Sequence, residues 1–60
     1  MPDDRTVYFE FTQVGPQVRV AAIDGATGVE VVIVGPATAA RADLEALALR
    51  KLERRLAKEL

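Results

Sequence analysis

The side chains best suited to bind a ligand gather near the C-terminus, where five cations fall between positions 50 and 58. At about 100° per residue on a helix they occupy one side and could bind a phosphate or carboxylate group. They are Arg50, Lys51, Arg54, Arg55 and Lys58. The simplest interpretation is a solvated helix face that also complements the helix dipole. An acidic partner or nucleic acid, bound weakly through these five residues, is the alternative.

This basic cluster gives the chain a marked charge asymmetry. Residues 1–37 carry two Arg against five Asp and Glu, whereas residues 38–60 carry six basic groups against four acidic ones. The formal net charge is only -1. Any attraction for anions therefore belongs to the C-terminal third of the chain.

Two loop segments resemble ligand-binding motifs but fit turns better. Asp24, Gly25, Thr27 and Gly28 could suggest a cation loop, yet the alternating acidic ligands of a calcium site are missing, so we predict a hairpin loop. The segment 35–38, Gly-Pro-Ala-Thr, lies between a strand and a helix as phosphate loops do. Its proline removes a backbone donor and no GKS or GKT follows, so it predicts the end of the sheet and a helix cap.

The remaining acid-base groups do not make a catalytic site. Glu10, Asp24 and Glu30 are the candidates, but the chain has no His and no Cys, and 60 residues leave little room for an enclosed pocket. Zinc-type ligands are missing for the same reason. We therefore expect no enzymatic activity, no catalytic residues, no cofactor and no metal.

Hydrophobic periodicity predicts a single α+β domain over residues 1–60. Period-two alternation and turn residues predict strands at about 6–14, 17–24 and 29–34. From about residue 38 to 59 the chain consists mainly of strong helix formers without Gly or Pro. Because the two loops between the strands are short, the strands should form an antiparallel meander, followed by one C-terminal helix laid across one face, a β-β-β-α unit.

The two turns also predict the register of the sheet. Phe11 should face Val20 and Phe9 should face Ala22, while Val31 and Ile33 complete the same rows on the helix side. The opposite face then carries three rows, which are Tyr8-Ile23-Glu30, Glu10-Ala21-Val32 and Thr12-Arg19-Val34. A single helix covers one face only, so this second, half-apolar face should lack a partner within the chain.

The leucines of the helix do not fit one face. On a helical wheel Leu49, Leu52, Leu56 and Leu60 form one stripe, which we expect to pack on the sheet. Leu44 and Leu47 fall outside this stripe and should face elsewhere.

A chain this short has a marginal core, and neither a disulfide nor a metal is available to stabilise it. We therefore expect a homodimer in which a second copy covers the open face. A face or helix contact is slightly favoured over edge pairing through residues 29–34. The candidate self-association residues are Tyr8, Ala21, Ile23, Val32, Val34, Leu44 and Leu47.

Four segments, VYFEF, VRVAAID, TGVEVVIVGP and DLEALALRKLERRL, resemble in order and spacing a family of about 60-residue alphaproteobacterial proteins of unknown function. The resemblance covers nearly the whole chain and implies a compact domain without an assigned activity. Members are sometimes labelled serine hydroxymethyltransferase. The residues do not support that label, because the only lysines, Lys51 and Lys58, lie on a solvated helix and not in a cofactor pocket.

A weaker resemblance links the three strands and helix to the double-stranded RNA-binding domain. Gly15 and Pro16 match its glycine-proline loop, but only Arg41 is basic where that family places phosphate-binding lysines. The resemblance therefore does not predict RNA binding.

The sequence predicts a small non-enzymatic interaction module that acts as a homodimer. An accessory role in a larger complex is one function that such a module could have. The N-terminal residues do not form a signal peptide, and the chain lacks an apolar run long enough to cross a membrane, so we expect a bacterial cytoplasmic protein.

Overall fold

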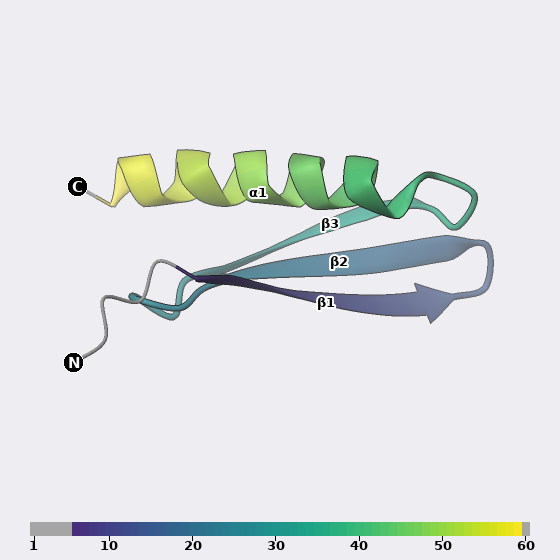
Figure 1. Ribbon diagram of the computed structural model, residues 1–60, viewed down its shortest axis with the longest axis horizontal. Coiled ribbons are helices and arrows are strands. Elements are labelled where there is room, and N and C mark those ends of the chain that lie inside the picture. The colour runs from purple at the N-terminus through teal and green to yellow at the C-terminus, as the bar shows by residue number, and fades with distance from the viewer. Residues whose placement is uncertain (1–5, 60) are drawn as a thin grey trace.

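The computed structural model describes residues 6–59, which form three strands followed by one helix (Figure 1). The strands are β1 (Val7–Val14), β2 (Gln17–Asp24) and β3 (Glu30–Pro36), and the helix is α1 (Arg41–Lys58). The sheet is antiparallel with the order β1-β2-β3. The predicted α+β fold with a β-β-β-α order is confirmed.

Both hairpin turns form where the sequence places them. Gly15 has a φ of 60° in the first turn, and Gly28 has a φ of 76° in the second. The Asp24 carboxylate accepts a hydrogen bond from the Thr27 N–H at 3.0 Å and another from the Thr27 hydroxyl at 2.6 Å. Asp24 therefore stabilises its own loop, as the prediction of turn chemistry requires.

The register of the sheet is also as predicted. Phe11 pairs with Val20 and Phe9 with Ala22 between β1 and β2. Between β2 and β3, Ala22 pairs with Val31 and Val20 with Ile33. Because strand side chains alternate between faces, this register directs the predicted core set toward the helix.

The core lies between the sheet and α1. The buried residues are Val20, Ala22, Val31, Leu44, Ala48 and Leu52. Half-buried apolar side chains surround them, including Phe9, Phe11, Ile33 and Leu56. Two of the six buried residues are alanines, which allow the helix to approach the central strand closely.

The predicted face of the helix is partly wrong. Leu44 is 4% exposed and belongs to the core, so it does not face away from the sheet. The buried stripe runs through Leu44, Ala48, Leu52 and Leu56, and its centre lies about 60° from the predicted one. Leu49 is half-buried and lies outside the core cluster. Leu60, the last member of the predicted stripe, is outside the described residues.

The junction between sheet and helix also differs from the prediction. β3 continues through Gly35 to Pro36, so these two residues do not end the sheet before residue 35. Pro36 is accommodated because it closes an edge strand, where a missing N–H breaks no ladder bond. Residues 37–40 then make a turn, and α1 begins at Arg41, not at about residue 38. Ala40 is the N-cap and provides no side-chain hydrogen bond.

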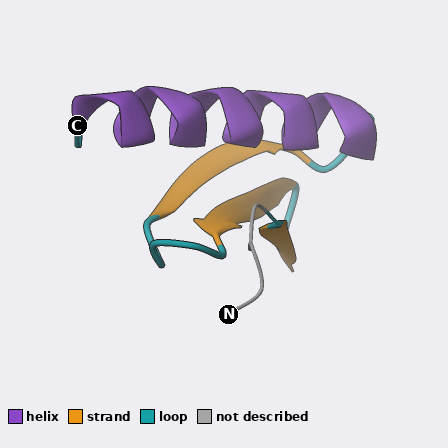
Figure 2. Cartoon of the chain, turned by 60° about the vertical axis from the view of Figure 1, so that its left-hand side comes forward, coloured by secondary structure: helices purple, strands orange, loops and turns teal. Residues whose placement is uncertain are grey.

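The helix packs on two of the three strands. Its main contacts are with β2 and β3, and β3 lies directly beneath the helix axis in the rotated view (Figure 2). β1 lies farthest from α1. The helix-facing side of β1 is therefore only partly covered, which explains why Phe9 and Phe11 are half-buried.

Candidate functional site

The face of the sheet opposite α1 carries the predicted rows of side chains. Tyr8, Ile23 and Glu30 form one row. Tyr8 is 52% exposed and Val34 55% exposed, while Ile23 and Val32 are half-buried by their neighbours. No residue in the described range packs against this face as a second layer. This face is therefore available for a partner.

Charged side chains are mixed into this open face. A shallow hollow of about 80 Å³ lies between Glu10, Glu30 and Arg19, with Ala21 and Val32 in its wall. Within residues 6–59 none of these three charged groups forms an ion pair. Ala21 is only 9% exposed, so this self-association candidate offers little surface of its own. A partner of this face must match charges as well as apolar groups.

The basic side of α1 forms a second candidate surface. Lys51, Arg54, Arg55 and Lys58 line a hollow of about 250 Å³ together with Val31 of β3. Arg50 is exposed but does not line this hollow. The structure thus brings four of the five predicted basic residues together and leaves one apart.

Two of these four cations already have partners. The Lys51 ammonium donates a hydrogen bond to the Val32 carbonyl oxygen at 2.7 Å. The Arg55 Nε donates to the Glu59 carboxylate at 3.3 Å, and both side chains are about half exposed. Neither Arg54 nor Lys58 has a partner among residues 6–59. The hollow can therefore attract an anion, but with two free cations and not five.

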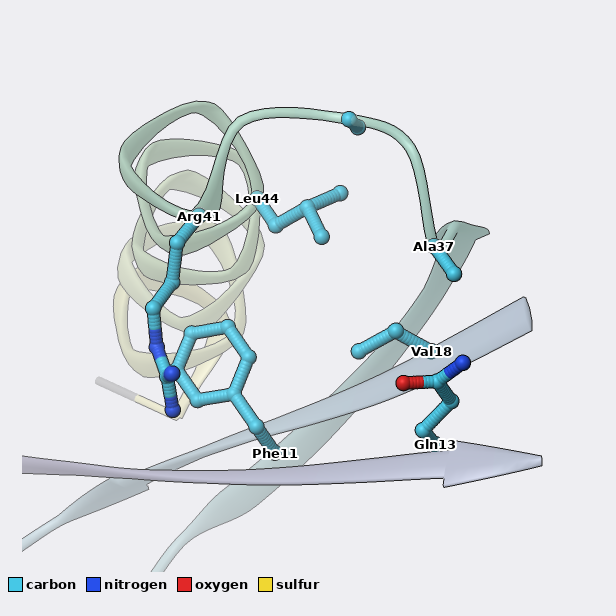
Figure 3. Close-up of a pocket in the computed structure, with 7 residues that line it drawn as sticks. Phe11, Gln13, Val18, Ala37, Arg41 and Leu44 are labelled. Atoms are coloured by element: carbon cyan, nitrogen blue, oxygen red, sulfur yellow. The ribbon is translucent and has the colours of Figure 1, made fainter. Parts of the chain in front are cut away.

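A third hollow, which the sequence did not predict, lies beside β1 at the start of the helix (Figure 3). It has a volume of about 320 Å³ and is lined by Phe11, Gln13, Val18, Ala37, Ala39, Arg41 and Leu44. The Arg41 guanidinium carbon lies 4.0 Å from the centroid of the Phe11 ring. Such an exposed cation-π contact contributes about 0.5 to 1 kcal/mol.

This hollow forms between elements that are distant in the sequence, so no local sequence pattern predicts it. Phe11 and Arg41 are 30 positions apart, and the hollow between them exists because the helix covers β1 only in part. Sequence reasoning assigned Phe11 to the core, because alternation alone cannot show that the helix stops short of the first strand.

The acidic candidates do not converge on one point. Asp24 is occupied in its loop, while Glu10 and Glu30 are exposed on the open face. In the part of the chain that the structure describes, no group of three potential metal ligands gathers.

Leu47 and Leu44, the two helix leucines expected to face outward, have different positions. Leu47 is 49% exposed on the outer side of α1, as predicted. Leu44 is in the core and is no longer a candidate for self-association. Among residues 6–59, no helix has both the length and the apolar character required to cross a membrane.

These features define a small α+β domain whose available surfaces are an open sheet face, a basic helix side and a partly covered first strand. The chain belongs to the family described as a domain of unknown function, DUF6898, whose model matches residues 4–59. This match confirms the resemblance to a small family of unknown function. Comparison with curated proteins gave no match, and comparison with solved structures gave none either.

Proposed function

We propose that the chain is a small non-enzymatic interaction module that acts as a homodimer. The observation that carries this proposal is the position of α1, which covers β2 and β3 on one face. The opposite face and the margin of β1 are left with exposed apolar side chains, among them Tyr8, Val14 and Val34. The half-buried Ile23 and Val32 lie on the same face, and a contiguous apolar patch is typical of surfaces that bind another protein.

The small core supports the same proposal. Of the six buried core residues, two are alanines, and Leu52 is the largest of those that are fully buried. The chain contains no cysteine that could stabilise it by a disulfide. Because a domain of this length buries too little surface for high stability, burial against a second copy would add a substantial share.

Sedimentation velocity at protein concentrations from low micromolar to near millimolar tests the homodimer. We expect a shift from the mass of one chain, 6.5 kDa, toward twice that mass as concentration rises. A chain that sediments as a monomer over the whole range would exclude the homodimer.

We further propose that this module is an accessory component of a larger complex. Purification of the tagged chain from its own cells, followed by identification of the proteins that accompany it, tests this role. Recovery of the chain with no other protein in stoichiometric amount would argue against it. We propose the cytoplasm of an alphaproteobacterium as the location, in keeping with the family resemblance.

A second candidate function is weak association with nucleic acid through the basic side of α1. The supporting observation is that Lys51, Arg54, Arg55 and Lys58 line one hollow. If all four contact phosphates of duplex DNA, the logarithm of affinity should fall with the logarithm of salt concentration with a slope of about -3 to -4.

Charge reversal tests this second function. Arg54→Glu with Lys58→Glu removes the two cations that have no partner among the described residues, and it should abolish binding to a DNA duplex. Arg54→Glu alone and Arg50→Glu form the matched pair, because each reverses one helix charge and only Arg54 lines the hollow. Arg50→Glu should weaken binding much less than Arg54→Glu. Equal losses in the two variants would indicate unspecific attraction to the helix and would exclude the hollow as a site.

A further inference from the structure

The two edges of the sheet are protected very differently. At the β3 edge, the Lys51 ammonium donates to the Val32 carbonyl at 2.7 Å, and Pro36 ends the strand. A lysine and a proline on an edge are two of the devices by which proteins prevent strands of other molecules from pairing there. α1 also packs on β3. Further pairing at this edge is therefore opposed.

The β1 edge lacks these devices. The strand runs for eight residues, VYFEFTQV, without Lys, Pro or Gly. Its only charge is Glu10, which points to the open face. No other strand among the described residues pairs with its outer side. A long, regular and largely apolar edge of this kind is a template for another strand.

The hydrogen-bond pattern identifies the backbone groups that this edge offers. The Gly25 N–H donates to the Thr6 carbonyl at 2.9 Å, so the pair Thr6 and Gly25 is of the hydrogen-bonded kind. In an antiparallel ladder such pairs alternate with pairs whose N–H and C=O groups point outward. The β1 residues with outward groups are therefore Val7, Phe9, Phe11 and Gln13.

The side chains beside this edge are incompletely covered as well. Phe9 and Phe11 are half-buried. Tyr8 and Val14, on the opposite face, are 52% and 61% exposed. A strand added at this edge would cover side chains on both faces while it satisfied the outward backbone groups.

We propose that β1 pairs in antiparallel fashion with β1 of a second copy, about a two-fold axis that passes beside Phe11. This inference rests on the proposed homodimer and specifies its contact surface. Tyr8 then faces Val14 of the second copy, and Glu10 faces Thr12. The two most exposed apolar side chains of β1 cover each other, and a hydroxyl lies opposite the carboxylate.

Neighbouring registers are less favourable. Centring the pair on Thr12 would place Glu10 opposite Val14 and Tyr8 opposite Pro16, which lies in the turn after β1. Centring the pair on Glu10 would place two carboxylates opposite each other, which is repulsive. Centring it on Phe9 would place Tyr8 opposite Glu10 and leave Val14 beyond the paired region. The register centred on Phe11 pairs residues 8–14 entirely within β1.

The resulting dimer has a continuous six-stranded sheet with one helix over each outer pair of strands. The strands at its ends are the two copies of β3, whose edges are protected by Lys51 and Pro36. Association therefore stops at two copies and does not continue into a fibre. The open faces of the two copies form one surface that remains available to another partner.

Gln13→Pro tests the edge, with Gln13→Ala as the matched control. Both variants remove the hydrogen bond from the Gln13 amide to the Gly15 carbonyl, and only proline also removes the outward N–H. Because Gln13 does not use this N–H in pairing with β2, the strand itself should persist, which circular dichroism of the dilute protein checks. We expect Gln13→Pro to raise the dimer Kd about tenfold or more and Gln13→Ala to leave it nearly unchanged.

The double variant Val32→Glu with Val34→Lys changes the open face and leaves the β1 edge intact. It should still dimerise. If it becomes monomeric while Gln13→Pro remains a dimer, the open face is the contact surface and the β1 edge is not. If the parent chain is itself monomeric, the proposed homodimer is wrong. A parent dimer with another contact surface would contradict only the pairing through β1.

Disulfide cross-linking identifies the register, because the chain has no cysteine of its own. Equal amounts of Tyr8→Cys and Val14→Cys chains should cross-link readily on mild oxidation, since these positions face each other. Each variant alone should cross-link slowly. All the positions used are exposed, so the fold does not depend on them. Faster cross-linking of Tyr8→Cys with Thr12→Cys or with Glu10→Cys would overturn the axis at Phe11.

Discussion

At the scale of single residues, Gly35 sets how closely the helix approaches β3. A Cβ atom at this position would lie 2.5 Å from the Leu44 Cδ2 atom, and Leu44 is 4% exposed. Leu44 also lines the hollow of about 320 Å³, so its side chain can move aside only by giving up part of its packing in the core. Gly35 is therefore needed for close approach, and not as a signal that ends the strand.

We expect Gly35→Ala to destabilise the domain by about 1 to 3 kcal/mol, the usual cost of an extra methyl group in a packed core. Urea unfolding measures the effect. In the Gly35→Ala background, Leu44→Val should cost less than it does in the parent, because the smaller side chain relieves the contact. Additive effects of the two substitutions would contradict this explanation.

At the scale of elements, the N-terminus of α1 lacks a side-chain cap. Ala40 is the N-cap with a φ of -64° and a ψ of 136°, and it has no side-chain oxygen to accept a bond from the first turn. Asp43 in the first turn partly compensates through the helix dipole. The extended backbone of Ala40 is the conformation that capping serines and aspartates adopt.

Ala40→Ser should therefore stabilise the domain by about 0.5 to 1 kcal/mol. Thermal melting at one fixed protein concentration measures the gain. Ala46→Ser is the control, because it introduces the same side chain at an exposed position inside the helix, where serine is slightly unfavourable. A similar gain in both variants would show that the effect is not capping.

At the scale of the whole molecule, folding and self-association should be linked. The domain is elongated, with extents of 39 × 23 × 16 Å, and one helix is its only second layer among residues 6–59. Much of the sheet therefore borders solvent in the single chain. If burial against a second copy supplies part of the stability, mass action makes the melting temperature depend on protein concentration.

We expect the melting temperature to fall on each tenfold dilution, until it reaches a constant value for the monomer. Gln13→Pro should show that lower value with little dependence on concentration. Scanning calorimetry of both proteins over the same range measures this. A parent melting temperature that does not change on dilution would show that the uncovered surfaces do not contribute to folding stability.

The sequence by itself determined the strands, their turns and their register. Gly15 and Gly28 take left-handed backbone conformations, Asp24 closes its own loop, and period-two alternation separates the two faces of the sheet. These features depend on neighbours in the chain or across a short hairpin. Such local geometry can be derived from residue types and spacing. The mixed character of the open face follows from the same register.

Only the tertiary structure decided how the helix is rotated and which strands it covers. Four leucines suggested a stripe centred near Leu52 and Leu56, but Ala48 and Gly35 allow close packing on the side that buries Leu44. Small residues give no signal in a hydrophobic pattern, although they decide where two elements can approach. The position of α1 over β2 and β3, which leaves β1 only partly covered, depends on packing contacts between elements distant in the sequence, so the pattern along the chain does not predict it.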